Sequence, residues 1–370
     1  MSESARNHAV LSRRRLLSAI LGSACFASSR VMGQTPLTGA PNPSVPPTRL
    51  IVSGNEASES GAFARLIAPS LSSGLGMQSD LDLAFDLGHD GVTAANLFDR
   101  NPPEDNREMA LVSKGSAVIA SLCDDARVHF DYSRWISVLA AQQTVMTIAR
   151  AELHRSFRAR VSGFLHDKPS RVAVAQPIGV ELATVLGLSV LGLHPLPVSG
   201  IVSQKKALAA LANNEVDAIQ LTLTHKDDFS ILHQLPEGIA PLFYVGADMV
   251  GVPRFEETFR QAFSRAPGST LYAGWRALSA AAATPILIAL PMLTSPVSVA
   301  RWRYAIGSVM DNEQVKSWLA AHALHPSTGV AASGVMASFT PELPALLALR
   351  RWLNINLPRW RLGQETKRSF

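Results

Sequence analysis

Histidines and paired aspartates are the residues in this chain whose types would suit metal binding or acid–base catalysis. The closest two of the ten histidines, His322 and His325, stand three residues apart at an expected helix end, with no acid or cysteine nearby. That setting is more typical of surface or capping histidines than of zinc ligands. The acidic pairs Asp124-Asp125 and Asp227-Asp228 have the surroundings of solvated loops rather than of a calcium loop or a catalytic dyad. We therefore expect no metal.

Nucleophilic residues are no better placed for catalysis. The segment Gly187–Gly192 approaches the Gly-x-Ser-x-Gly turn of hydrolases around Ser189, but its second glycine comes one residue too late. An apolar turn after a helix explains it better. Cys123 ends an apolar run, Ala117–Cys123, which predicts a buried strand and an inert thiol. Since the chain has no Gly-x-Gly-x-x-Gly, His-Glu-x-x-His or phosphate-binding loop, we expect no enzyme and no cofactor.

The positive charge of the chain is concentrated at its two ends. The 370 residues include 34 basic and 29 acidic side chains, a net charge of +5. Residues 1–33 hold five basic and one acidic, and residues 350–370 hold six and one, which leaves 23 and 27 between them, a net charge of −4. No basic surface large enough for a phosphate backbone is predicted. We expect no nucleic-acid partner.

The N-terminus has the order of an export signal. Arg13 and Arg14 precede a short apolar run from Leu16 to about Ala27, followed by small residues. The paired arginines favour the twin-arginine route over general secretion. A membrane anchor is the poorer alternative, because the run is too short to cross a bilayer. Cleavage would fall after Ala27 or Gly33, so residues 1–33 are assigned to the signal and the protein to the periplasm.

The signal also contains a candidate lipoprotein cleavage site before Cys25. This is the minority alternative, because Gly22 stands where such sites usually carry leucine. Residues 34–48 hold five prolines among small and polar residues, which predicts an extended leader. After signal removal Cys123 is the single cysteine, so the mature chain has no internal disulfide.

From residue 49 onward, apolar strand runs alternate with helical patterns, which predicts an α/β protein with mostly parallel sheets. A helix is expected over 61–75, with Ser60 as its N-cap. Strands are expected over residues 49–52, 109–112, 117–123, 171–175, 218–222 and 241–245. Further helices are expected over residues 139–165, 180–188, 204–213, 255–264, 297–311, 312–321 and 341–353.

Several short segments occur in a distinctive order between residues 49 and 360. They are Arg49–Val52 with Ala64–Leu71, Pro195–Gly200, Lys206–Ala218, Gly274–Pro285, Asp311–Pro326, Phe339–Leu343 and Trp360. In sequence and order these segments resemble one protein family, the Bug-type periplasmic substrate-binding receptors of tripartite tricarboxylate transporters.

The resemblance implies a type II-like periplasmic binding protein fold. Two α/β domains would be joined by two crossing strands, with the ligand in the cleft between them. The first domain would comprise residues 49–141 plus 273–370, and the second residues 142–272. Receptors of this family bind carboxylates with backbone N–H groups and helix N-termini, both of which attract anions.

The three ligand loops implied by the resemblance depart from the family's pattern. Residues 57–61 replace its successive glycines, residues 88–91 keep two glycines and gain a histidine, and residues 176–179 form the third loop. No Arg or Lys occurs in these loops, so we expect neutral donors rather than a cationic clamp. Ordinary βα turns would use the same residue types. The candidate ligand-binding residues are Ser58, Ser60, Gly61, His89, Gln176, Gly179, Ser199, Gly200 and Thr222.

The combined hypothesis is a monomeric solute-binding receptor that closes over a small carboxylate-bearing ligand and delivers it to membrane transporter subunits. Two alternatives stay open. One is a secreted α/β hydrolase-type enzyme with an unrecognised nucleophile. The other is a ligand-responsive sensor for a membrane partner, which differs only in what recognises the closed state.

Overall fold

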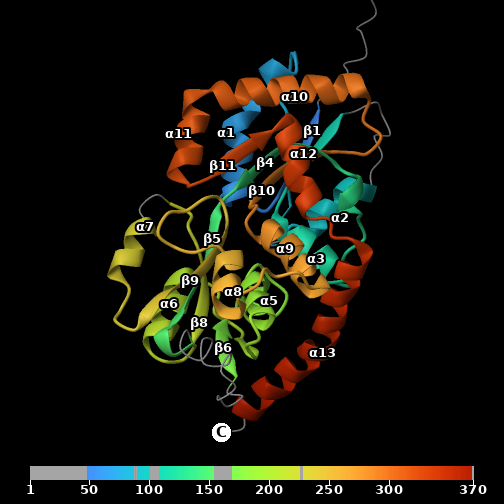
Figure 1. Ribbon diagram of the computed structural model, residues 1–370. Helices are drawn as coiled ribbons and strands as arrows, with labels where there is room; N and C mark the ends of the chain where they lie inside the picture. The colour runs from blue at the N-terminus through green and yellow to red at the C-terminus, as the bar shows by residue number, and fades with distance from the viewer. Residues whose placement is uncertain are drawn as a thin grey trace, which may run out of the picture. The chain divides into compact units, whose positions relative to one another are not determined.

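The computed structural model describes residues 48–86, 88, 90–100, 108–153, 169–225 and 228–368 (Figure 1). These residues belong to one compact unit, Val45–Phe370. The expected export signal over 1–33, with Cys25, and the leader up to residue 47 lie outside the described residues.

The first sheet has six strands in the order β11-β4-β10-β3-β1-β2. Strand β1 pairs in parallel with both β2 and β3, whereas β10, β4 and β11 are joined by antiparallel pairings. Helices cover both faces, which is why its central strands read as continuous apolar runs. The strands are β1 (Arg49–Ser53), β2 (Asp82–Asp86), β3 (Met109–Ser113), β4 (Ile136–Gln142), β10 (Ile286–Leu290) and β11 (His325–Thr328).

The second sheet has five strands in the order β7-β6-β8-β5-β9. Strand β6 pairs in parallel with β7 and β8, and β5 runs antiparallel to β8 and β9. Only Gln143 separates β4 of the first sheet from β5 of the second, so the chain crosses directly between them. The strands are β5 (Thr144–Arg150), β6 (Ser170–Ala173), β7 (Pro195–Val198), β8 (Ala218–Thr222) and β9 (Ile239–Gly246).

Serine side chains cap four of the described helices: Ser58, Ser203, Ser269 and Ser295 each accept the backbone N–H three residues on. The described helices are α1 (Glu59–Gly74), α2 (Val92–Arg100), α3 (Gly115–Leu122), α5 (Leu182–Val190), α6 (Gln204–Ala212), α7 (Asp228–Ile231), α8 (Phe255–Phe263), α9 (Thr270–Ala282), α10 (Pro296–Asp311), α11 (Glu313–Ala321), α12 (Gly329–Ser338) and α13 (Leu343–Arg368), with the 3-10 turns η1 (Tyr132–Arg134) and η2 (Leu232–Gln234). The predicted helices overlap the described ones at α1, α5, α6, α8, α10, α11 and α13, whereas α2, α7, α9 and α12 were not predicted.

Four expectations need correction. The sheets are mixed rather than mostly parallel, because the crossing strands β4 and β5 and their neighbours pair antiparallel. The helix expected over 139–165 is replaced by β4 and β5 up to Arg150, and residues 154–168 lie outside the described residues. The strand expected over 117–123 is helix α3. Both errors have one cause, since an element buried along nearly its whole length has no polar face that would separate a strand from a helix. The α1 cap is Ser58, not Ser60.

Helix α9 packs against α3, α5 and α13, and so connects elements that flank both sheets (Figure 1). Its Trp275 is 1% exposed and donates its indole N–H to the Ala183 carbonyl of α5, at 2.8 Å. The Trp275 ring contacts Phe243 of β9 and Phe255 of α8. This aromatic group belongs to the largest hydrophobic core of the chain.

Within the described part of the chain, no single helix has both the length and the apolar character to cross a membrane. Helix α12 and the first part of α13 meet that test only as a pair, bent by 50° at the break between them.

Gly115 opens α3 where its backbone touches the end of α9. A Cβ added there would overlap the Ala281 carbonyl and come within 2.8 Å of the Thr284 carbonyl oxygen. We expect Gly115→Ala to destabilise the fold by about 1–3 kcal/mol, because neither backbone group can move freely. Gly307→Ala, within α10, meets nothing within 4 Å and should stabilise by about 0.5–1 kcal/mol. Urea unfolding of both variants measures the difference, and equal midpoints would contradict this account of the contact.

Candidate functional site

Parallel strands place the ends of β1, β2 and β3 at one edge of the first sheet, and the polar candidates of the first loop gather there. Ser58 follows β1 as the cap of α1: its hydroxyl donates to the Asn55 carbonyl at 2.6 Å and accepts from the Gly61 N–H at 3.2 Å. Ser60 is 1% exposed, and its hydroxyl has no partner among the described residues. The first loop therefore holds one satisfied and one unsatisfied hydroxyl.

Lys114 brings a positive charge to this edge. It lies directly after β3, as the first flanking residue of α3, and its side chain extends toward the end of β1. Its Nζ lies 3.2 Å from the point that a Cβ on Gly54 would occupy, and the Ser58 hydroxyl lies 2.6 Å from the same point. Burial lowers the pKa of Lys114, although Glu59 and Asp90 attract the proton. An ammonium held in this way needs an anionic partner.

Glu59, the first residue of α1, has the opposite charge. Burial raises the pKa of its carboxyl group, against the attraction of His322, Lys114 and His225. Its Oε1 is buried without a hydrogen-bond partner, and no salt bridge joins Glu59 to any described residue. Glu59 and Lys114 are thus two half-buried, opposite charges that influence each other without forming an ion pair.

The raised pKa of Glu59 predicts a pH-dependent stability difference. The native state holds the proton more tightly than the unfolded chain, so stability falls as pH rises from the unfolded pKa through the native one. Glu59→Gln should therefore raise the melting temperature more at pH 8 than at pH 4. Glu313→Gln is the matched control, because Glu313 is the first residue of α11 and is exposed. Thermal scans at both pH values test this, and an equal gain at both would refute it.

The second sheet gathers the remaining candidates in the same way, at the ends of the parallel strands β6, β7 and β8. The turns after β6 and β7 adjoin, since the Gly200 N–H donates to the Ala175 carbonyl at 3.2 Å. Thr222 ends β8, the middle strand of the sheet, and is paired with Val145 of the neighbouring strand β5. The structure thus groups the predicted residues into two sets, one at each sheet. The second set is Gln176, Gly179, Ser199, Gly200 and Thr222.

Glu181 lies within this second set, immediately before α5. Its carboxylate accepts hydrogen bonds from its own backbone N–H and from that of Ala175, while burial raises its pKa. Glu181 Oε2 lies 2.9 Å from the position of a Cβ on Gly179. The N–H groups of the third predicted loop are therefore partly engaged by a carboxylate of the chain itself.

Two histidines, one after β8 and one at the end of α11, lie beside each other and close enough to Glu59 to act on its charge. His225, three residues after β8, has its ring 5.4 Å from that of His322, and both act electrostatically on Glu59. His322 ends α11 and stacks on Trp318 at 3.9 Å, with its Nδ1 2.8 Å from the Trp318 carbonyl oxygen. The expected capping role of His322 is confirmed.

Sequence reasoning missed Lys114 and Glu181. The sequence places Lys114 directly after an apolar strand run and Glu181 at a helix start, which are positions where a binding residue can lie. Solvated surface residues occur at the same positions, so these patterns alone do not indicate a site. His89 was also a candidate, and it lies outside the described residues.

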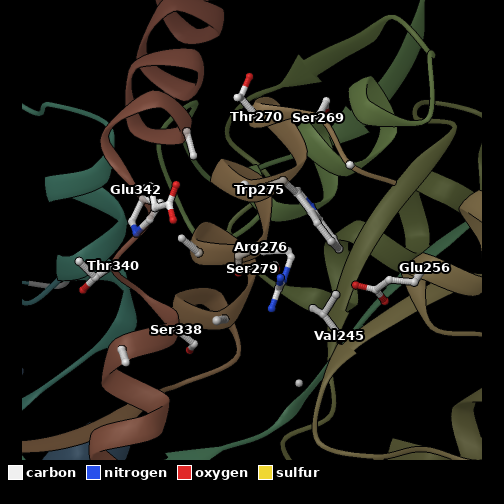
Figure 2. Close-up of a pocket in the computed structure, with 18 of the residues that line it drawn as sticks. Val245, Glu256, Ser269, Thr270, Trp275, Arg276, Ser279, Ser338, Thr340 and Glu342 are labelled. Atoms are coloured by element: carbon white, nitrogen blue, oxygen red, sulfur yellow. Dashed lines mark hydrogen bonds between the residues drawn. The ribbon is translucent and has the colours of Figure 1, made fainter. Parts of the chain in front are cut away.

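A separate hollow of about 640 Å³ lies between β9, α9 and the turn joining α12 to α13 (Figure 2). None of the predicted ligand-binding residues lines it. Its Glu256 carboxylate already accepts the Tyr272 hydroxyl at 2.6 Å, and its Arg276 is exposed. We assign no ligand to this hollow.

No protein-family model matches the chain, and no curated protein sequence matches it. Solved structures do match its fold. A TctC solute-binding protein from Polaromonas, without ligand, aligns with a TM-score of 0.60 and 13% identity over 83% of this chain and 98% of that one. The periplasmic binding protein BugD aligns with a TM-score of 0.50 and 13% identity over 84% and 96%. An R. palustris protein with adipate aligns with a TM-score of 0.50 and 14% identity over 84% and 95%.

The chain therefore has the fold of the two-domain periplasmic binding proteins. Among these, the neighbours are solute-binding proteins of the TctC and Bug type, so the expected resemblance is confirmed at the level of the fold.

Proposed function

We propose that the chain is an extracytoplasmic solute-binding receptor that closes over a small carboxylate-bearing ligand and delivers it to a membrane transporter. Lys114 is the observation that carries the proposal. It is a half-buried ammonium without an ion-pair partner among the described residues, at the edge where three parallel strands end. The unpartnered hydroxyls of Ser60 and Ser113 lie on the elements that flank it. A ligand carboxylate would neutralise the ammonium and accept from such donors.

The fold supports this function, and one neighbour was solved with adipate. A thermal-shift screen of mono-, di- and tricarboxylates and of amino acids tests it. Each hit is compared with an uncharged diol of the same length, because a carboxylate site should not respond to the diol. A ligand at 100 times its Kd should stabilise the chain by about 2.7 kcal/mol. Stabilisation by no carboxylate, together with turnover of chromogenic esters, would favour the secreted hydrolase instead.

Domain closure is the second part of the proposal. The first sheet takes its strands from residues 49–142 and 286–328, and the second from residues 144–246, which supports domains at 49–141 plus 273–370 and at 142–272. Closure about the crossing strands should reduce the radius of gyration when a ligand from the screen is saturating. Small-angle scattering with and without that ligand measures this change. Superimposable curves would contradict closure.

Export is the third part. Replacing Arg13 and Arg14 by lysine should stop export through the twin-arginine route, whereas the mature protein should begin near Ser28 or Gln34 in the periplasm. Fractionation and N-terminal sequencing test both statements. An uncleaved chain in the periplasm would contradict the signal assignment.

A further inference from the structure

The charged residues at the two sheet edges narrow the chemical class of the ligand further than carboxylate-bearing molecules in general. An anion-binding loop normally offers backbone N–H groups at a helix start, without a competing negative charge. Here Glu59 is the first residue of α1 and Glu181 immediately precedes α5. Both loops therefore carry a glutamate where a second ligand carboxylate would have to approach.

The two glutamates differ in their surroundings. The Glu181 carboxylate interacts with the backbone of Glu181 itself and of Ala175, and it lies beside Gly179, so it competes for donors that a ligand would otherwise use. The Glu59 carboxylate has a buried oxygen without a partner and no salt bridge among the described residues. A half-buried carboxylate with one buried, unpartnered oxygen is stabilised when a cation pairs with it. A ligand ammonium group would supply that cation to Glu59.

Lys114 is the complementary group. It adjoins Ser58 near the start of α1 and likewise lacks a salt bridge among the residues described. Glu59 and Lys114 act on each other electrostatically but are not joined directly. A ligand carrying one positive and one negative group would pair with each of them.

We propose that the ligand is a zwitterion, an amine-bearing monocarboxylate whose ammonium group pairs with Glu59 and whose carboxylate pairs with Lys114. Glu181 excludes a second carboxylate from the loop before α5. This inference rests on the proposed receptor function and names its ligand class. It assigns selectivity to three residues that the predicted set of neutral donors did not contain.

The test compares ligands that differ in one charged group. Calorimetric titrations of the mature chain at pH 7.5 use γ-aminobutyrate against succinate, ε-aminocaproate against adipate, and pools of neutral α-amino acids. At least one zwitterion should bind about tenfold or more tightly than the dicarboxylates. Glu59→Gln should weaken the zwitterion by about 10- to 100-fold, because one charged hydrogen bond is lost, and should strengthen the dicarboxylates. Glu181→Gln should strengthen the dicarboxylates alone.

Glu313→Gln, at the exposed start of helix α11, controls for a general effect of removing a carboxylate and should change neither affinity. If a dicarboxylate binds more tightly than every zwitterion and Glu59→Gln leaves that order unchanged, the zwitterion assignment is wrong while the receptor function stands. If none of these probes binds the wild-type chain, both proposals fail.

Discussion

Lys114→Met is expected to reduce the affinity for the ligand by roughly 30- to 1000-fold, or about 2–4 kcal/mol, while the fold persists. The ammonium lies at the edge formed by β1, β2 and β3, so its removal takes the proposed ion pair from the ligand carboxylate and leaves it the neighbouring hydroxyl and N–H donors. Because burial lowers the Lys114 pKa, its charge is unfavourable in the free protein, and the variant should melt at the same temperature or higher.

Calorimetry with the ligand found in the screen measures this loss, and circular dichroism confirms the fold. Lys316→Met is the matched control, because Lys316 is exposed on α11 and pairs with Glu313. Its affinity should equal that of the wild type. An affinity within about twofold of the wild type for Lys114→Met would show that the ligand carboxylate binds elsewhere.

Trp275→Ala is expected to cost about 3–5 kcal/mol of unfolding free energy, the range for removing a fully buried aromatic side chain. The change leaves a cavity between α8, α9 and β9 and removes the donor to the Ala183 carbonyl at the start of α5. The loss should be larger than that of Gly115→Ala, because a whole ring system and a buried hydrogen bond disappear together.

Urea unfolding at fixed pH measures the effect through the transition midpoint. Arg276→Ala changes the next residue of the same helix, whose side chain is exposed, and should stay within about 0.5 kcal/mol of the wild type. If Trp275→Ala unfolds within about 1 kcal/mol of the wild type, the aromatic group does not hold α9 in place.

The elements with a clear period or a clear boundary could be predicted from the sequence. Strand β1 is a short apolar run before a polar loop, and α1 follows with regular apolar spacing, so both lie where they were expected. Helix α3 and strands β4 and β5 were assigned wrongly, because nearly all of their residues are buried, polar ones included, so no polar face marks their period. Their type is decided by neighbours far along the chain, which local sequence does not contain.

The residues of the candidate site likewise fall into those that local sequence predicts and those that depend on long-range pairing. Ser58 and Thr222 lie at strand or helix ends, as the βα pattern predicted. The proximity of Lys114 to Ser58 depends on the pairing of β1 with β3, and the influence of His225 on Glu59 depends on how the loop after β8 approaches α11. Long-range pairings of this kind have no signature in a single sequence. The expectation of purely neutral donors was drawn from the three predicted loops, and it left out the residue after β3, Lys114.

A crystal structure of the mature chain with the ligand from the screen tests the central claim most directly. We predict density for one small molecule with a carboxylate against Lys114 and the start of α1, and with contacts to the loops after β6, β7 and β8. Density in the hollow between β9, α9 and α13 instead, or a hydrolysed product at any site, would contradict the account.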